Sequence, residues 1–207
     1  MHISEGVLSP MVLGAGYALS LVPTAIGLRK MDYDQVMTVA LLSAVFFVGS
    51  LIHVPLGPGS VHLLLNGLVG LLLGWACFPA ITAALILQGV MLQFGGLSTL
   101  GVNLFTMAFP ALSCGLIFRR FLFTSPRQRF LASFGAGFTA VLLSSLLMAS
   151  ALTFTDQGFL ATARLIIAAH LPVMVIEGVV TAFVVSFLAR VQPEMLMNIT
   201  RTKERKA

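Results

Sequence analysis

The sequence predicts an all-α, polytopic membrane protein, and three observations lead to this class. Hydrophobic residues make up 58% of the 207 residues and charged residues only 9%. Soluble globular proteins carry roughly 25% charged residues, so this chain has too little polar surface for water. Its apolar residues form long runs, and about 20 such residues cross a bilayer as a helix. The positive charge lies almost entirely on alternate connections between these runs.

Seven apolar runs are expected to be transmembrane helices. In chain order they are Val7–Leu28, Val36–Ile52, Leu63–Ala76, Ala80–Leu92, Leu100–Phe118, Phe130–Phe154 and Leu165–Ala189. The third is short for a full crossing, and its boundary with the fourth is the least sharp of the set. Turn-forming and polar segments end the other runs. We therefore expect a single transmembrane domain spanning residues 1-207.

The basic residues predict the orientation of this domain. Seven crossings from an outside N-terminus place eleven of the twelve Lys and Arg residues on one side, because Arg164 alone falls on the other. The positive-inside rule assigns the basic side to the cytoplasm. The N-terminus is then outside, and residues 190-207 form a cytoplasmic tail. Because the pI of about 9.9 reflects this layout, nucleic-acid binding is not expected.

The chain is not expected to begin with a cleaved signal peptide. No Lys or Arg precedes Arg29, whereas a secretory signal needs a basic segment before its apolar stretch. Met1 and His2 are therefore expected to remain in the mature protein. Cys77 and Cys114 each stand alone in an apolar run and are expected to be free, buried thiols.

Small residues recur at four-residue spacing in two of the runs. Gly70 and Gly74 form one pair, and Ala132, Ala136 and Ala140 form a stripe. Such residues let helices approach closely in lipid. Internal helix packing explains them, and docking of another membrane subunit is the alternative.

Ionisable residues inside a membrane are costly and therefore indicate function. Of the four histidines, His2, His53 and His62 fall on the predicted outer side. His170 lies in the last run, two helical turns before Glu177, so the two share a helix face. A structural hydrogen-bonded pair is the favoured interpretation of His170 and Glu177, with a transport role as the alternative.

His2 stands where it can chelate a metal ion together with the chain terminus. The terminal amine and the His2 amide nitrogen close a five-membered ring, and the His2 Nδ1 closes a six-membered ring with that amide. These three nitrogens lie in one plane, and one histidine from elsewhere would complete a square. Square-planar nitrogen geometry suits Ni(II) or Cu(II), Co(II) is also accepted, and tetrahedral Zn(II) fits poorly. Taken alone, His2 is better explained as an arbitrary second residue on a frayed tail.

The segment 53-62 is the expected source of the fourth nitrogen. Two prolines and two glycines exclude an ordinary helix here and favour a rigid turn. Its two histidines, His53 and His62, are nine residues apart, which is not a standard zinc spacing. Each is otherwise explained as a hydrogen-bonded histidine at the membrane interface.

Three blocks of this sequence resemble the CbiM/NikM family, the substrate-capture components of energy-coupling-factor transporters. The opening Met1-His2-Ile3-Ser4-Glu5-Gly6 is similar to the family's Met-His-Ile-x-(Glu/Asp)-Gly start. Residues 54–62, Val-Pro-Leu-Gly-Pro-Gly-Ser-Val-His, resemble its proline-glycine loop ending in Ser/Thr-x-His. Residues 95–103 resemble its Gly-Gly-x-x-x-Leu-Gly-x-Asn segment. Many relatives have an acidic residue or histidine before the two glycines, where this chain has Gln93-Phe94.

The resemblance implies that residues 1-6 fold back into the membrane domain and bind the metal ion. The implied ligands are the Met1 amine, the His2 amide, the His2 imidazole and the His62 imidazole. Four further residues are expected to orient these ligands, or in one case to bind the ion transiently. They are Ser60, Asn103, Glu5 and His53. The resemblance does not specify the role of His53, which either orients the ligands or binds the ion transiently. An alternative for Asn103 is that it only holds its own loop together.

The resemblance also implies an assembly and a source of energy. The chain would capture Co(II) or Ni(II) at the outer face of a prokaryotic inner membrane, with no other cofactor. It contains no Gly-x-x-x-x-Gly-Lys-(Ser/Thr) phosphate loop, so ATP hydrolysis is expected from partners. The implied partners are a transmembrane coupling subunit, two ATPase subunits and a small accessory membrane protein.

Two other functions compete with metal capture. An intramembrane enzyme would require His-Glu-x-x-His or Gly-x-Ser-x-Gly, and the sequence has neither. A vitamin-capture component would require aromatic residues around an outer cavity, and the one Trp lies at the predicted cytoplasmic end of its run. Metal capture is therefore the favoured function, and the protein is not expected to be an enzyme.

Overall fold

The computed structural model describes residues 2–56, 59–193 and 195–196, without the side chains of residues 54–61. In this part of the chain seven α-helices form, which agrees with the predicted all-α class. They are α1 (Pro10–Lys30), α2 (Val36–Gly49), α3 (Asn66–Leu73), α4 (Cys77–Leu92), α5 (Leu100–Phe118), α6 (Pro126–Thr155) and α7 (Leu160–Val191). Short 3-10 turns occupy Tyr33–Gln35, Gly74–Ala76, Arg119–Phe121 and Gln157–Phe159. An antiparallel hairpin, β1 (His53–Leu56) and β2 (Gly59–His62), joins α2 to α3.

The helices are long and apolar enough for a membrane protein, but two are shorter than expected. Within the described residues, five helical stretches have the length and hydropathy to cross a bilayer: 10–30, 66–92, 100–121, 126–155 and 157–191. The expected span Val36–Ile52 is a helix of only 14 residues, and Leu63–Ala76 contains a helix of only 8. Val36–Ile52 was therefore wrongly predicted as a full crossing, and Leu63–Ala76, already short for one, holds a still shorter helix that belongs to the single stretch 66–92. By length and hydropathy, the described residues support five crossings and not the seven predicted.

The helices α2 and α3 are short because extended chain lies between them. Extended chain occupies the hairpin, and Leu65 then takes a left-handed conformation with φ +54° immediately before α3. The end of α2 meets the start of α3, since Gly49 lies against Leu63 and Leu65. The hairpin pairs His53 with His62, so both histidines lie at its open end. Each short helix is thus continued by one strand of the hairpin.

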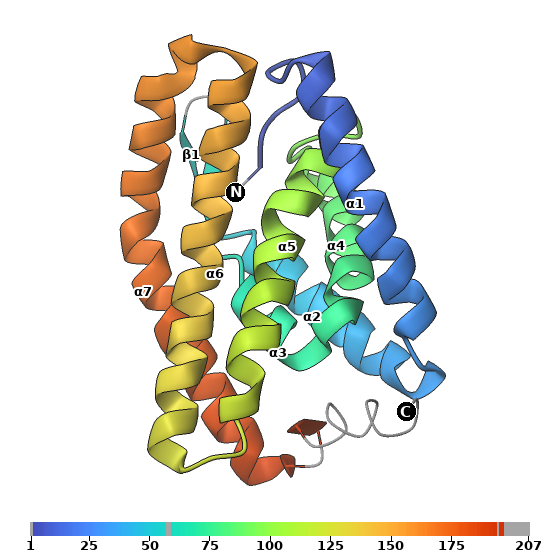
Figure 1. Cartoon of the computed structure of the whole chain (residues 1–207), viewed down its shortest axis with the longest axis vertical. Coiled ribbons are helices and arrows are strands. Elements are labelled where there is room, and N and C mark those ends of the chain that lie inside the picture. The colour runs from blue at the N-terminus through green and yellow to red at the C-terminus, as the bar shows by residue number, and fades with distance from the viewer. Residues whose placement is uncertain (1, 57–58, 194, 197–207) are drawn as a thin grey trace.

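Helix α3 and helix α4 run in opposite directions beside α5 (Figure 1). Asn66 donates to the Met107 carbonyl, and Gly70 abuts Ala111, so α3 follows α5 in the same direction. The chain reverses at Gly74, whose φ of +55° favours glycine. The Cys77 thiol then faces the Ala108 carbonyl as α4 begins its return.

The predicted small-residue packing is internal to the domain. A methyl group on Gly70 would lie 1.8 Å from the Ala111 carbonyl oxygen, and one on Gly67 would lie 2.6 Å from the Gly137 Cα. The stripe of Ala132, Ala136 and Ala140 on α6 is buried. Close backbone contact thus draws α3 against both α5 and α6. The two cysteines are free and buried, as expected.

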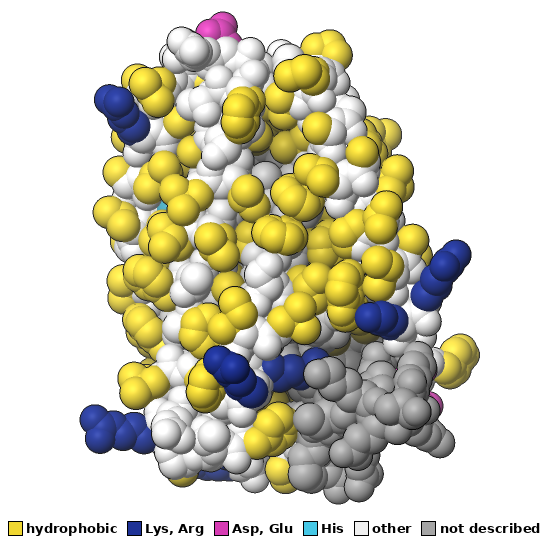
Figure 2. Space-filling model, in the orientation of Figure 1, with side chains coloured by type: hydrophobic (Ala, Val, Ile, Leu, Met, Phe, Trp, Pro, Cys, Tyr) yellow, Lys and Arg dark blue, Asp and Glu magenta, His cyan; other side chains and the backbone are white. Residues whose placement is uncertain are grey.

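The surface fits a membrane environment. Hydrophobic side chains cover the middle of the face drawn in Figure 2, and most Lys and Arg side chains on it lie toward one end. This is the end at which α1 finishes with Arg29 and Lys30. The positive-inside rule predicts that it faces the cytoplasm. The orientation itself remains a prediction.

Candidate metal centre

The structure brings His2 and His62 together in the half of the molecule that holds the N-terminus, away from the end of α1 with Arg29 and Lys30 (Figure 1). His62 Nε2 lies 3.0 Å from His2 Nδ1, and the two rings stack with centroids 4.7 Å apart. Both side chains are almost completely buried, at 3% and 2% exposure. Sixty residues of sequence separate them, so the hairpin and the N-terminal segment must both fold for this contact to form.

In each ring, the nitrogen that does not face the other histidine bonds to a hydrogen-bond acceptor. His62 Nδ1–H donates to the Leu63 carbonyl oxygen over 2.9 Å. His2 Nε2–H donates to the Gln88 Oε1 over 2.7 Å. With the Gln88 amide in this orientation, each ring directs an unprotonated nitrogen at the other. Burial lowers the pKa of both histidines to about 4, so both are neutral at pH 7.

Two neutral imidazoles with facing lone pairs do not form a hydrogen bond with each other. A cation placed beside both nitrogens would satisfy them, which is the ordinary state of histidine as a metal ligand. The bonds from the outer nitrogens to Leu63 and Gln88 are of the kind that fixes ring orientation in metal sites. The arrangement is therefore chemically suited to a transition-metal ion.

Asn103 of α5 fixes the N-terminal segment in place. Its Oδ1 accepts from the Ile3 N–H over 2.9 Å, and its Nδ2 donates to the Ile3 carbonyl over 3.1 Å. The same Nδ2 lies 3.2 Å from the Thr99 Oγ1, so Asn103 also supports its own loop. Ile3 is completely buried. Asn103 thus holds its own loop, as one interpretation of the sequence suggested, and also the residue next to His2. Its role in orienting metal ligands stays a prediction.

Glu5 makes a second attachment of the segment to the same loop. Its Oε1 accepts from the Ser98 N–H over 3.0 Å and from the Ser98 hydroxyl over 3.1 Å. The backbone hydrogen bond from Ser98 lowers the pKa of the Glu5 carboxyl. Glu5 is exposed, so it contributes to placing the segment at its outer end.

The two glycines before Ser98 make room for the segment. Gly95 has φ +74°, and a methyl group on it would lie 2.8 Å from the Asn103 Nδ2. Gly96 has φ +145°, and a methyl group there would overlap the Glu5 side chain. Backbone conformation and lack of space both require glycine at these positions. Side chains at positions 95 and 96 would therefore collide with Asn103 and Glu5, the two residues that attach the N-terminal segment.

The Phe94 ring packs against two histidines, His2 and His53. Its ring lies 5.7 Å from that of His2 and packs edge-on against His53 at 4.5 Å. His53 is exposed, and its Nδ1 lies 3.3 Å from the Leu51 carbonyl. His53 therefore lies at the surface, and Phe94 contacts both its exposed ring and the buried ring of His2. A transient contact with an arriving ion stays a prediction.

Sequence reasoning missed the roles of Gln88 and Phe94. The completely buried amide of Gln88 contacts His2. A buried polar residue in the middle of an apolar run was the available signal. Met1 lies outside the described residues, as does the Ser60 side chain, so the predicted role of each stays a prediction.

His170 and Glu177 are both completely buried on α7, but they do not bond each other. The His170 Nδ1–H donates to the Ile166 carbonyl over 2.7 Å. The Glu177 carboxylate accepts from the backbone of Leu64 and Leu65. The expected pairing of the two side chains is therefore wrong, because each has a nearer backbone partner.

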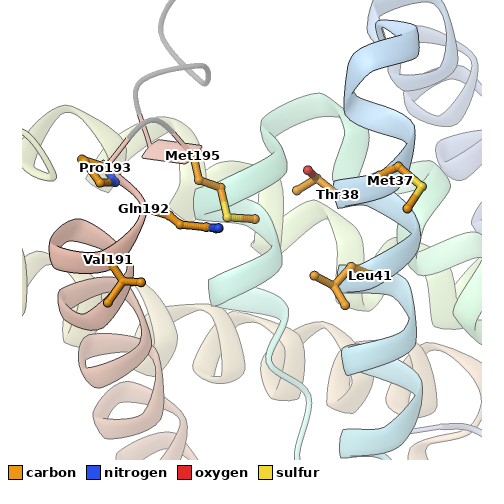
Figure 3. Close-up of a pocket in the computed structure, with 7 residues that line it drawn as sticks. All are labelled: Met37, Thr38, Leu41, Val191, Gln192, Pro193 and Met195. Atoms are coloured by element: carbon orange, nitrogen blue, oxygen red, sulfur yellow. The ribbon is translucent and has the colours of Figure 1, made fainter.

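Other parts of the described chain offer no competing metal site. No group of three or more His, Cys, Asp or Glu side chains gathers among the described residues. A groove between the start of α2 and the end of α7 lies near the opposite end of the molecule (Figure 3). It is lined by Met37, Thr38, Leu41, Val191, Gln192, Pro193 and Met195. None of these side chains is ionisable.

Fold and site together define a class: a polytopic helical membrane protein in which two buried, neutral imidazoles face each other. The family model described as "Cobalt uptake substrate-specific transmembrane region", CbiM, matches residues 2–195. The chain therefore belongs to the CbiM family of metal transport components.

Known proteins agree with this assignment. A Haemophilus influenzae protein with the provisional name of metal transport protein is 41% identical over 200 residues, covering 95% of this chain and 97% of that protein. The fused nickel transport protein NikMN of Rhodobacter capsulatus is 34% identical over 52% of this chain and 33% of its own length. A crystal structure described as a transition metal transporter superposes with a TM-score of 0.78 at 26% identity, covering 92% and 93% of the two chains.

Proposed function

We propose that this protein is the substrate-capture subunit of an ATP-driven energy-coupling-factor transporter that takes up Co(II) or Ni(II). The ligands would be the Met1 amine, the His2 amide nitrogen, the His2 Nδ1 and the His62 Nε2. Membership of the CbiM family supports the transport of a metal ion. The geometry of the two histidines supports the ligand set.

The observation that carries this proposal is the distance of 3.0 Å between His2 Nδ1 and His62 Nε2. In a square of donors about 2.0 Å from a metal ion, neighbouring nitrogens are about 2.8 Å apart. The apo distance is thus close to that of two adjacent corners. Only a small movement is needed for both nitrogens to bind one ion.

The remaining two corners would come from the chain terminus. The amide of His2 and the amine of Met1 are joined to the His2 ring by the covalent chain, so their chelate rings need no further residue. Asn103 holds Ile3 by two hydrogen bonds immediately after this chelate. These bonds would keep the N-terminal segment beside His62, so that the Met1 amine and the His2 nitrogens can bind the ion.

Four nitrogen donors in a plane favour Ni(II) by geometry, and Co(II) is accepted by the same donors. Zinc prefers a tetrahedron and is disfavoured. The relatives carry both cobalt and nickel in their names. We propose that one of these two ions is the transported substrate and that no further cofactor is bound.

Energy for transport would come from partner subunits in a prokaryotic inner membrane. We propose a transmembrane coupling subunit, two ATPase subunits and a small accessory membrane protein, as the family resemblance implies. The basic connections on the predicted cytoplasmic side are the expected docking region. Release of the ion would require residues 2–5 to leave Asn103 and Ser98.

The chelate predicts a sharp dependence on chain position, which a titration tests. The purified chain, tagged only at its C-terminus, is titrated with Ni(II), and the titration is repeated with leucine and proline inserted between Met1 and His2. The proline nitrogen carries no hydrogen, so no continuous run of amine and amide nitrogens reaches the His2 ring, although every side chain remains. Affinity should therefore fall by at least about a hundredfold, and the visible square-planar band should vanish. Equal affinity in both proteins would refute the ligand set.

A further inference from the structure

His170 carries a buried nitrogen with an unused lone pair. The residue lies on α7 with 0% exposure, and its Nδ1–H donates to the Ile166 carbonyl over 2.7 Å. Because a carbonyl only accepts, the proton of the neutral ring is on Nδ1 and the lone pair is on Nε2. Among the residues that the structure describes, none bonds to this Nε2. Leaving such a nitrogen unpaired inside a membrane protein is costly, which indicates a function.

The backbone that follows His62 is attached to the same helix. Strand β2, which ends at His62, contacts α7, and the next residues Leu64 and Leu65 donate their N–H groups to Glu177. His170 precedes Glu177 by seven residues, or about 10 Å of helix. His62 precedes Leu64 by two residues, or at most about 7 Å of extended chain. His62 is therefore held beside α7, near the stretch that carries His170 and Glu177.

The electrostatics of His62 indicate that it lies toward His170. Burial is the main cause that lowers the pKa of His62, the bond to the Leu63 carbonyl opposes this change, and His170 lowers the pKa further. Two like charges affect a pKa in this way only when the two groups are close. The chain from His62 to Leu65 therefore follows α7 in the direction of the helix, which brings His62 alongside His170.

The two rings offer nitrogens of the same kind. In each ring, Nδ1–H donates to a backbone carbonyl, that of Leu63 or that of Ile166, and Nε2 is left as the donor to a metal ion. A hydrogen bond of this kind fixes the ring of most histidines that bind metals. Imidazole nitrogens suit first-row transition metal ions such as Ni(II). His170 thus has the bonding of a metal ligand.

We propose that His62 and His170 form a second holding position, which the metal ion takes when the N-terminal segment leaves. The ion would keep the His62 Nε2 as a ligand and exchange the nitrogens of residues 1 and 2 for the His170 Nε2. His2, His62 and His170 do not gather as one cluster in the described part of the chain, so the two positions are used in turn. The proposal rests on the proposed function in one respect, which is that His62 binds the transported ion.

A full chain with His2 and His53 both replaced by Ala isolates the second position. This two-histidine chain keeps only His62 and His170 of the four histidines, provided that its C-terminal tag contains none. It should bind Ni(II) more weakly than wild type, because the chelate has lost its imidazole. X-ray absorption of the Ni(II)-loaded two-histidine chain should show two imidazole donors. A single imidazole, or no binding, would overturn the proposal.

Replacing His170 with Phe in the two-histidine chain keeps a ring of similar size and removes the nitrogen. The remaining Ni(II) affinity, measured by isothermal titration, should then fall by at least about tenfold, because one of two protein donors is lost. The same replacement in the wild-type chain should cost several-fold less affinity, because the N-terminal chelate holds the ion there. The difference between the two chains measures the dependence of the ion on His170.

Thr181 provides a matched control on the same helix. Its side chain is also completely buried, and within the described ranges its Oγ1 also has no hydrogen-bond partner. It lies eleven residues beyond His170, which is about 16 Å along the helix. Thr181→Val in the two-histidine chain should therefore keep the remaining Ni(II) affinity within about twofold.

Equal losses from Thr181→Val and His170→Phe, or equal losses from His170→Phe in both chains, would assign His170 to helix packing and overturn the proposal. If His170→Phe does not fold, X-ray absorption of the two-histidine chain decides alone. Failure of the proposed function looks different, since the leucine and proline inserted after Met1 would then leave the affinity of the wild-type chain unchanged. The two imidazoles of the two-histidine chain do not depend on that result.

Discussion

Replacing Asn103 with Ala should detach the N-terminal segment from the metal centre. The change removes both hydrogen bonds to Ile3, at 2.9 and 3.1 Å, and leaves two buried backbone groups without partners. A net hydrogen bond is worth about 0.5–1.5 kcal/mol, and a stranded buried group costs about 1–3 kcal/mol. Since the segment can escape part of this cost by leaving its site, we expect its docking to weaken by about 2–4 kcal/mol.

This loss should appear directly in metal affinity. At about 1.4 kcal/mol for each factor of ten, Ni(II) binding falls by about 30- to 700-fold. Isothermal titration of the purified chain measures this change. A shift of His2 away from His62 should also weaken the visible band of the square-planar complex.

A matched control is available in Asn66. Its side chain is equally buried and also donates to a carbonyl, that of Met107, and to the Ser144 hydroxyl, but it does not touch the N-terminal segment. Asn66→Ala should lower the melting temperature while affinity stays within about threefold. Wild-type affinity in Asn103→Ala, or an equal loss in both variants, would refute the docking role.

Three further predictions concern the packing of α3, the exposed His53 and the titration of His2 and His62. Gly70→Ala should prevent folding, because a methyl group would lie 1.8 Å from the Ala111 carbonyl oxygen, whereas Gly14→Ala, which meets nothing within 4 Å, should keep the wild-type melting temperature. His53→Ala should leave equilibrium Ni(II) affinity within about threefold, because the His53 ring is exposed and packs against Phe94. A loss of affinity as large as that of His62→Ala would contradict its place at the surface. Apo stability should fall as the pH drops from about 6.5 toward 4, because the pKa values of His2 and His62 are lowered to about 4 and the unfolded chain binds these protons first. Thermal melts at several pH values check this, and His62→Leu should show a shallower dependence.

The sequence predicted the membrane class and the positions of all seven helices, because long apolar runs have few alternative explanations. It did not predict that α2 is short or that Leu63–Ala76, already short for a crossing, holds a helix of only 8 residues. Val36–Ile52 and Leu63–Ala76 are apolar over most of their length, and hydropathy does not distinguish extended chain in a protein interior from helix. The left-handed Leu65 and its bonds to Glu177 arise from tertiary contacts, which hydropathy does not report.

Two residues of the candidate site could be predicted, because the chelating chemistry of one of them depends on its position next to the chain terminus. His2 and His62 were identified from the N-terminal chelate and the family resemblance, and the structure brings their nitrogens together. The contacts of Gln88 and Phe94 were not predictable, because neither residue belongs to a motif that specifies a partner. The pairing of His170 with Glu177 was wrong because spacing on one helix face does not exclude backbone partners from other elements.

X-ray absorption spectroscopy of the Ni(II)-loaded chain tests the central claim most directly. The account predicts four nitrogen donors in a square plane, including the signature of two imidazoles. In His62→Ala one imidazole should disappear from this signature, and a donor from solvent should replace it. A six-coordinate site dominated by oxygen donors, or a spectrum unchanged in His62→Ala, would contradict the account.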